Sequence, residues 1–394
     1  MDNIVQSIKQ MKKMGIIMIV LLFLCISCNK NNNEGDLNKT GYPVQEEIVD
    51  GIKTIMNPDF PRDGQIKYKM ADVITLGGDE GPEEGMLFYP YKIRVDTQNN
   101  IYVLDIQDKK IKIYDDKGNW VHNIGGRGQG PGEFMAIGDF DVSYDGRIFV
   151  SDLRQSQISI LRTDGSFLSS FIMRSCERLR VDEQGQIYLQ QFISSMKTAS
   201  SDSWDYEMLI KRVDSKGKNI YEFGKFKDRK HVQITKIVNG ESHVSGHSSP
   251  DGHITVWIVG KDCRLYLGYS RDYLFTVLDK NGKPLFKFGR QFTPIPHPIY
   301  SPDLAHPKYY PAFYSSGYLF FDDENNLWLR QYTQSENDGC VYDVFSPDGI
   351  FIRQALVPAT IFCYRKGKAY SIVELESGFY EVTYYRLIES ESKD

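Results

Sequence analysis

Apolar residues recur along this chain at a fixed spacing. In each copy, an apolar position is followed six residues later by a second apolar position and then by an aromatic residue. The copies are Val95, Ile101 and Tyr102; Val142, Ile148 and Phe149; Val181, Ile187 and Tyr188; Val259, Leu265 and Tyr266; Phe321, Leu327 and Trp328; and Cys363, Ala369 and Tyr370. Flanking runs of alternating character, such as YKIRVD and IYVLD, predict β-strands, because successive side chains of a strand point to opposite faces. The spacing therefore predicts repeats of one supersecondary unit.

Tight-turn sequences between these runs predict antiparallel hairpins. YDGR joins the first and second strands of one copy, and DDKG, TDG, DSKG, DKNG and SPDG join the third and fourth strands of five copies. Asp-Gly and Asn-Gly pairs between apolar runs are strong hairpin signals, because glycine adopts positive φ without steric cost. Each copy is expected to be a four-stranded antiparallel meander. The sequence thus predicts an all-β fold, a six-bladed β-propeller of four-stranded antiparallel blades.

The sixth copy lacks a fourth strand, since the chain ends shortly after residues 379–387. An unassigned strand, KYKMADVITLGG, precedes the first copy. We expect this N-terminal strand to close the last blade, because a closed ring has no exposed strand edge. The propeller is therefore predicted to span residues 66–390, preceded by a tether and lead-in at 28–65.

Residues 1–27 have the features of a secretory signal. The basic Met11-Lys12-Lys13 precedes an apolar run from Ile16 to Leu24 that is too short for a permanent membrane span. With Cys25-Ile26-Ser27-Cys28, the segment resembles a bacterial lipoprotein signal. That resemblance implies that Cys28 carries the lipid, palmitate included, and anchors the protein to a membrane of the cell envelope, the outer membrane being expected. A plain signal peptide with an incidental cysteine is the alternative.

The glycine-rich stretch GGRGQGPGEF, at 125–134, invites comparison with phosphate-binding loops. It matches neither the spacing of a dinucleotide fingerprint nor the Gly-Lys-Ser/Thr of a P-loop. It lies between the fourth strand of the first blade and the first strand of the second, so we expect it to carry the chain from the rim to the channel. Followed by FDVSYDGRIFVSD, it resembles the NHL-type repeat, and the whole chain is similar to the six-bladed propeller lipoproteins common in Bacteroidetes. The resemblance implies a fold and a location in the cell envelope, but it says little about a catalytic or binding function.

Connections on one face of the predicted propeller are much longer than the turns on the other. They span 194–204, 225–251, 290–316 and 331–339. Because loops on a rigid scaffold carry function, this long-loop face is the expected working face. Three cations that follow fourth strands, Arg127, Lys225 and Arg290, are candidates for seating an anionic ligand such as a uronate or a phosphate. Solvated surface charge is the alternative.

Two further groups of candidates lie in the predicted long loops. Tyr309, Tyr310 and Tyr314, in a proline-rich segment, are candidates for stacking on sugar rings or gripping a peptide, with packing on the blades as the alternative. His243, His247, His297 and His306 are candidates for a zinc site, although no metal-binding motif supports it. Calcium or zinc at the channel mouth stays open, and no cofactor is otherwise predicted.

The predicted innermost strands carry charges at equivalent positions in the first three copies. These residues are Arg94, Asp141 and Arg180, and the later copies have Ile258 and Phe320 there. We expect the charged side chains to pair between neighbouring blades, while the alternative is that they point into the channel.

The composition excludes some classes of function. The 394 residues have a net charge of −5, without the basic character of a nucleic-acid binder. Cys176, Cys263, Cys340 and Cys363 form no C-x-x-C pair and are expected to be buried free thiols. A nucleophile elbow is also absent.

The sequence favours a lipid-anchored module that binds a glycan, a peptide or a protein. The alternative is a hydrolase or lyase of the lactonase or glycosidase type that uses a metal or carboxylates.

Overall fold

The computed structural model describes residues 41–197, 203–238, 241–248, 255–296, 313, 316–332 and 339–390. The chain divides into two units, Met1–Pro43 and Val44–Asp394, and the fold below is that of the second. Within the described ranges, no helix is long and apolar enough to cross a membrane. The predicted signal and Cys28 lie outside the described residues.

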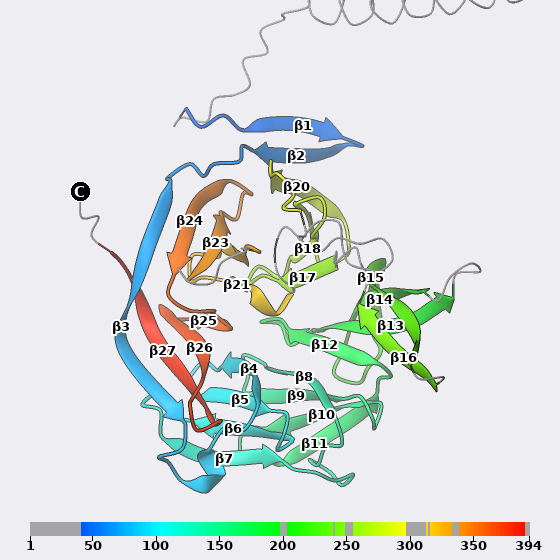
Figure 1. The fold of residues 1–394 in the computed structure, drawn as a ribbon, viewed down its shortest axis with the longest axis vertical. Helices are drawn as coiled ribbons and strands as arrows, with labels where there is room; N and C mark the ends of the chain where they lie inside the picture. The colour runs from blue at the N-terminus through cyan, green and yellow to red at the C-terminus, as the bar shows by residue number, and fades with distance from the viewer. Residues whose placement is uncertain are drawn as a thin grey trace, which may run out of the picture. The chain divides into compact units, whose positions relative to one another are not determined.

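The second unit is a six-bladed β-propeller, as the sequence predicts (Figure 1). Blades one and two are β4(Pro90–Val95), β5(Ile101–Asp105), β6(Lys110–Tyr114), β7(Trp120–Gly125) and β8(Ile137–Val142), β9(Arg147–Asp152), β10(Gln157–Arg162), β11(Phe167–Ile172). Blades three and four are β12(Cys176–Val181), β13(Ile187–Lys197), β14(Ser203–Val213), β15(Asn219–Val238) and β17(Thr255–Val259), β18(Leu265–Tyr269), β19(Leu274–Leu278), β20(Pro284–Arg290). Blades five and six are β21(Leu319–Phe321), β22(Leu327–Arg330), β23(Cys340–Phe345), β24(Phe351–Val357) and β25(Cys363–Arg365), β26(Lys368–Glu374), β27(Tyr380–Glu389), β3(Gln65–Gly77).

The N-terminal strand β3 closes the ring, which confirms the prediction. It pairs antiparallel with β27, from Glu381 opposite Gly77 to Glu389 opposite Tyr68. At its start, β3 also pairs in parallel with β24, where Ala355 lies opposite Ile66. This second pairing joins blades five and six into one eight-stranded sheet. The closing strand therefore holds two blades together.

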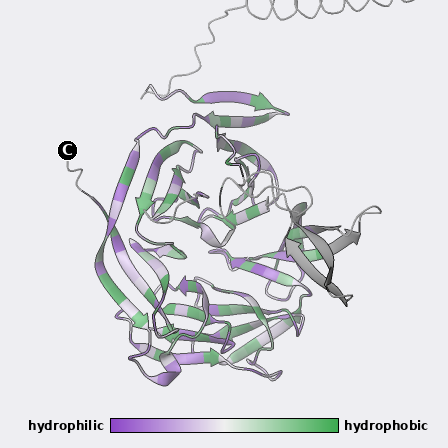
Figure 2. Ribbon diagram, viewed as in Figure 1, coloured by the Kyte–Doolittle hydropathy of each residue, from purple (hydrophilic) through white to green (hydrophobic). Residues whose placement is uncertain are grey.

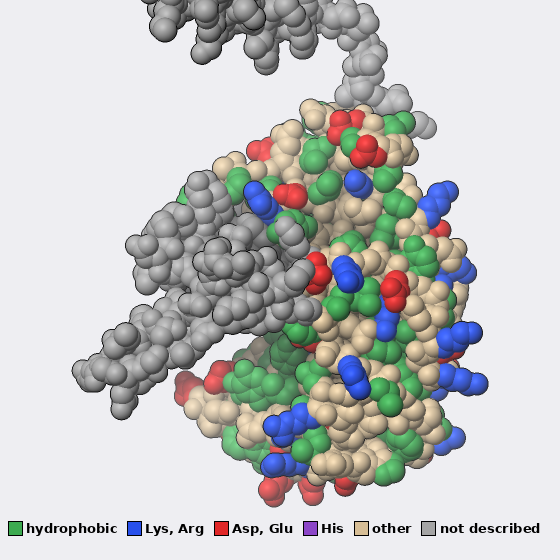
Figure 3. Space-filling model, turned by 90° about the vertical axis from the view of Figure 1, so that its right-hand side faces the viewer, with side chains coloured by type: hydrophobic (Ala, Val, Ile, Leu, Met, Phe, Trp, Pro, Cys, Tyr) green, Lys and Arg blue, Asp and Glu red, His purple; other side chains and the backbone are tan. Residues whose placement is uncertain are grey.

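A hairpin that was not predicted extends blade four. β1(Gln45–Val49) pairs antiparallel with β2(Ile52–Asn57), and β2 pairs in parallel with β20. Asn57, which is fully buried, fixes β2 in place: its amide donates to the carbonyl oxygens of Gly289 and Gly349, and its side-chain oxygen accepts from the N–H of Phe351. Figure 3 shows acidic side chains at the upper end of the molecule, where Figure 1 places this hairpin.

Blade three is also longer than predicted. The segments 194–204 and 225–251 were expected to be loops, but β13 and β14 remain paired as far as Lys197 and Trp204. β15 continues to Val238 and pairs with a fifth strand, β16(Glu241–Ser248). The prediction failed because polar and β-branched residues of an extended hairpin lack the clear alternation of a half-buried strand.

Apolar faces of neighbouring blades pack against one another and form the core. One cluster combines Tyr102 and Leu104 of blade one with Phe140, Ile148 and Val150 of blade two. Figure 2 shows hydrophobic residues distributed along the strands of every coloured blade. The core therefore lies between blades, which leaves the ends of the innermost strands free to carry polar groups.

The glycine-rich connection after β7 is filled by its own side chains. Gly125 has φ 92°, and a Cβ there would lie 2.8 Å from the ring of Phe134, which is fully buried. The N–H of Gly130 donates to the Glu133 carboxylate at 2.9 Å. Gln155 of the next blade donates to the carbonyl oxygen of Glu133. This arrangement supports the structural interpretation of the stretch, because the Glu133 carboxylate and backbone carbonyl oxygens already accept from N–H groups that a phosphate would need.

Candidate functional site

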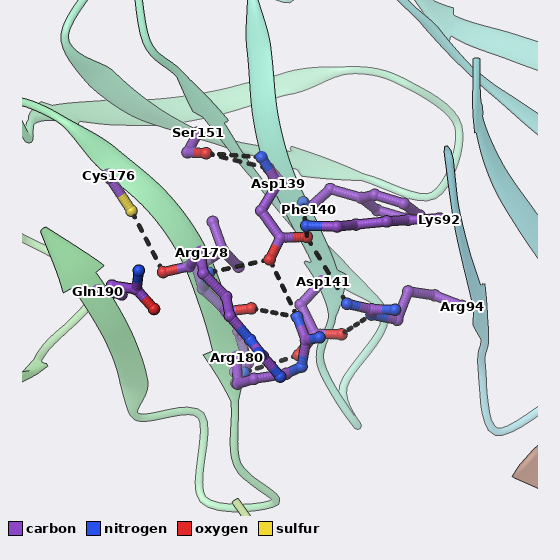
Figure 4. A network of polar contacts seen from close by, with 12 residues as sticks. Lys92, Arg94, Asp139, Phe140, Asp141, Ser151, Cys176, Arg178, Arg180 and Gln190 are labelled. Atoms are coloured by element: carbon purple, nitrogen blue, oxygen red, sulfur yellow. Dashed lines mark hydrogen bonds and ion pairs between the residues drawn. The ribbon is translucent and has the colours of Figure 1, made fainter. Parts of the chain in front are cut away.

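Charged side chains of the first three blades converge on the innermost strands β4, β8 and β12. Lys92, Asp139 and Arg178 lie opposite Leu104, Ser151 and Gln190 of the adjacent second strands. Two residues further along, Arg94, Asp141 and Arg180 lie opposite Tyr102, Phe149 and Tyr188. Figure 4 shows these side chains pointing toward one another from three blades. We call Lys92, Arg94, Asp139, Asp141 and Arg180 the axial cluster.

Asp139 is the centre of the axial cluster, and its side chain is fully buried. Its Oδ1 lies 2.8 Å from Lys92 Nζ and 3.6 Å from Arg94 Nη2, while its Oδ2 lies 3.1 Å from Arg180 Nη1. The backbone N–H groups of Phe140 and Leu179 also donate to this carboxylate. Asp139 therefore connects blades one, two and three.

Asp141 makes a second bridge between the same blades. Arg94 Nε donates to Asp141 Oδ1 at 2.8 Å, and the N–H of Val181 donates to Oδ2 at 2.8 Å. The expectation that Arg94, Asp141 and Arg180 pair between blades is correct for Arg94 and Asp141. Arg180 instead contacts Asp139, which was not among the predicted residues.

The innermost strands of blades four and five carry apolar residues where blades one to three carry charges. The corresponding positions of blades four and five, Ile258 and Phe320, are 8% and 6% exposed. In blade six, Cys363 lies opposite Tyr370, so the six-residue spacing assigned to this copy is off by one. The reason is a two-residue turn, in which Lys366 and Gly367 both have positive φ, as a type I′ turn requires. The structure thereby places Cys363 at the position of Arg94, and its thiol interacts electrostatically with Arg94, Asp141 and Arg180.

The axial cluster holds three cations around two carboxylates, and the pKa values reflect that imbalance. Burial, with smaller contributions from Arg180 and Arg94, lowers the pKa of Lys92 to about 8 against the opposing effect of Asp139. Burial also lowers the pKa of Arg180, and its repulsion by Arg94 adds to the effect. Although burial alone raises it, the three cations hold the pKa of Asp139 well below its ordinary value. The site thus stabilises an ionised carboxylate, and its cations, joined by the neighbouring guanidinium of Arg178, outnumber its carboxylates.

An aromatic surface adjoins the cluster at the start of β4. Lys92 Nζ lies 5.2 Å from the ring centre of Tyr91, a side chain that is 50% exposed. Tyr89 is equally exposed and contacts Tyr380 of blade six edge-on, with 6.0 Å between ring centres. Since β4 begins after a blade-to-blade connection and ends at a short turn, these rings lie toward the long-loop face.

The three cations predicted as an anion seat are not equivalent in the structure. Gly125 of β7 and Gly289 of β20 both lie opposite the first residue of a third strand, so Arg290 corresponds to Gly126 and not to Arg127. Arg127 and Lys225 are exposed.

Arg290 is a largely buried structural residue and so does not lie on the rim as the predicted anion seat requires. Its side chain is 10% exposed, and its Nε lies 2.7 Å from the fully buried Asp343. Its guanidinium also lies 4.5 Å from the ring centre of Tyr273. The buried Asp343 carboxylate needs a nearby positive charge, and the Arg290 guanidinium supplies it from its position at the end of β20.

The other predicted residues lie mostly beyond what the structure describes. His243 and His247 are on β16, opposite Lys236 and Val232, and therefore not in a loop. Outside the described residues are the remaining candidates, His297, His306, Tyr309, Tyr310 and Tyr314. Of the proline-rich segment, Phe313 is described: it is fully buried and packs edge-on against Tyr273. Among described residues, no three His, Cys, Asp or Glu side chains are close enough together to hold a metal ion.

Sequence reasoning missed Lys92 and Asp139, although a signal was present. Each lies two residues before a charged position that was identified, in YKIRVD and GDFDV. Residues two apart in a strand share a face, so a charge at both positions marks a polar stripe. The repeat comparison examined one position per strand and therefore found three of the five residues of the cluster.

Comparisons with known proteins agree with the fold. Residues 72–244 match the DUF5128 family model, which is described as a 6-bladed beta-propeller. No curated protein matches the chain.

Solved structures with a similar fold include proteins from Bacteroides. A protein of Bacteroides fragilis that carries the name of an exported protein is 13% identical, with a TM-score of 0.52 over 84% of this chain and 99% of that one. A DUF4221 family member from Bacteroides vulgatus is 11% identical, with a TM-score of 0.48 over 83% and 99% of the two chains. Virginiamycin B lyase from Staphylococcus aureus is 12% identical, with a TM-score of 0.40 over 80% and 99%. At such low identity the first of these shows a shared fold alone, and the weaker two support no inference about activity.

Proposed function

We propose that this protein is a lipid-anchored β-propeller of the cell envelope that binds a ligand at the long-loop end of its channel. The lipoprotein-like segment ending in Cys28 supports the anchor, and the name of the similar Bacteroides fragilis protein agrees with export. The location expected from the signal is the outer membrane. The ligand is a glycan, a peptide or a protein.

The observation that carries the proposal is the axial cluster. Burying charged side chains is costly unless they are paired, and blades four and five place the apolar Ile258 and Phe320 at the corresponding positions. Lys92, Arg94 and Arg180 keep 15–18% of their side-chain surface exposed, so a ligand has access to all three. Polar groups that converge from several blades beside an apolar half are typical of ligand sites.

The alternative function, a hydrolase or lyase that uses paired carboxylates, receives no support from the axial cluster. A general acid or base needs a pKa near the working pH, and cations keep that of Asp139 far below it. Both oxygens of Asp139 and both oxygens of Asp141 already accept hydrogen bonds or ion pairs from blades one and three. These carboxylates therefore organise cations and are poorly suited to proton transfer.

The test is a ligand screen on the mature lipoprotein and on an Arg94→Met variant. Neutral and acidic glycans and peptides would be screened by thermal shift, and the hits measured by titration calorimetry. We expect a hit that Arg94→Met weakens at least ten-fold and that is recovered chemically unchanged after incubation. Equal binding by the variant would contradict the proposed site, and conversion of the ligand would establish the enzymatic alternative.

A further inference from the structure

We propose that the axial cluster seats the acidic group of an anionic saccharide, with Lys92, Arg94 and Arg180 around its carboxylate or phosphate and the sugar ring against Tyr91. The inference rests on the proposed function, because it names the class of ligand for the same site. It replaces the anion seat predicted at Arg127, Lys225 and Arg290.

Charge balance is the first argument. Among the described residues, Lys92, Arg94 and Arg180 make their ion pairs with Asp139 and Asp141, and the same two carboxylates also face the neighbouring guanidinium of Arg178. Arg94 Nη2 is buried and makes the 3.6 Å ion pair with Asp139, but it has no hydrogen-bond acceptor among the described residues. An oxyanion at the exposed side of the cluster would supply the missing negative charge, and charge-assisted hydrogen bonds of this kind are the strong ones.

Access is the second argument. The three cations belong to β4 and β12, while the carboxylate between them belongs to β8, so the cations approach from both sides of blade two (Figure 4). Each retains some exposed side-chain surface, and Asp139 retains none. A ligand that enters the channel therefore meets cations before it meets the central carboxylate.

The neighbouring aromatic ring favours a saccharide over a small inorganic ion. Tyr91 is half exposed and lies beside the ammonium group of Lys92. Aromatic rings offer large, rigid contact area to the apolar face of a sugar. A sugar whose ring covers Tyr91 would hold an attached acidic group close to Lys92 Nζ.

The site should also respond to pH. Lys92 of β4 faces Asp139 of β8 and Arg180 of β12, with Arg94 and Tyr91 on its own strand. In the free protein its pKa is about 8, so its charge is lost as the pH rises through that value. Anion affinity should therefore fall between pH 7 and 9, and Lys92→Met should remove that dependence.

The experiment compares galacturonate and glucose 6-phosphate with galactose and inorganic phosphate, at constant ionic strength, on the full mature protein. We expect either acidic sugar to bind at least ten-fold more tightly than galactose, and the two acids to distinguish carboxylate from phosphate. Lys92→Met and Arg180→Met should each weaken the acidic sugar at least ten-fold, while Lys117→Met, in an exposed turn of the opposite face, should not.

A matched pair of tyrosine variants tests the stacking. Tyr91→Ala should weaken the acidic sugar several-fold and leave inorganic phosphate unaffected, whereas Tyr144→Ala, on an exposed turn of the other face, should change neither. Preference for galactose over galacturonate and glucose 6-phosphate in the wild type would overturn the proposal even if the cluster variants fail to fold. A neutral ligand that depends on Arg94 would overturn the anion seat but leave the proposed function intact, and acidic sugars that bind equally well to Arg94→Met would overturn both.

Discussion

Replacing Arg290 by methionine should destabilise the fold without affecting ligand binding. Methionine fills a similar volume but removes the charge that lies 2.7 Å from Asp343, whose side chain is fully buried. Tyr273, Gln331 and Gln354 would still donate to that carboxylate. The variant therefore leaves a buried charge that is hydrogen-bonded but no longer neutralised.

The expected cost follows from this environment. Removing one partner of a buried ion pair costs about 3–5 kcal/mol, and the three remaining donors place this case at the lower end, about 3 kcal/mol. Loss of the contact between the guanidinium and the ring of Tyr273, 4.5 Å from its centre, adds roughly 1 kcal/mol or less. With about 2 °C per kcal/mol for a large domain, the melting temperature should fall by roughly 6–8 °C.

Equilibrium denaturant unfolding measures the cost, and Arg127→Met is the control. Arg127 is exposed, so its replacement should change the free energy of unfolding by about 0.5 kcal/mol or less. A double-mutant cycle of Arg290→Met with Asp343→Asn should give a coupling of at least about 1 kcal/mol. Equal stabilities of Arg290→Met and Arg127→Met would refute the structural assignment of Arg290, and so would a loss of ligand binding in a fully folded Arg290→Met protein.

Three further predictions concern ring closure, the buried amide and the anchor. Deleting residues 66–76 should cause aggregation or a large fall in melting temperature, because β3 pairs with both β24 and β27. Deleting residues 29–40 should cause neither. Equal behaviour of the two truncations would rule out closure by β3. Asn57→Ala should cost about 3 kcal/mol or more in denaturant unfolding, since it leaves three backbone groups of blades four and five without partners, and a cost below about 1 kcal/mol would contradict that role. Cys28→Ala should abolish labelling by fatty acid and release the protein from membranes, and continued labelling would refute the lipoprotein hypothesis.

Local patterns in the sequence were sufficient to predict the six-bladed fold. The spacing from Val95 to Ile101 reports a strand, a turn and a second strand, and the structure pairs these two residues directly. The same logic predicted closure by β3, because a blade that lacks one strand needs a partner with unpaired backbone groups. Such features depend on alternation and turn chemistry within about ten residues, which a sequence displays directly.

Tertiary structure decided which charges meet. Arg127 and Arg290 look alike in sequence, yet only Arg290 has a buried carboxylate, 53 residues away, within 2.7 Å. The pairing of Lys92 with Asp139 and the placement of Cys363 opposite Tyr370 likewise depend on strand register and on neighbouring blades. A periodic pattern determines which face of a strand is apolar. The partner of a charged group is decided by the closed ring of blades, which brings distant strands together. The reason is that Coulomb energy depends on distance and burial and not on separation along the chain.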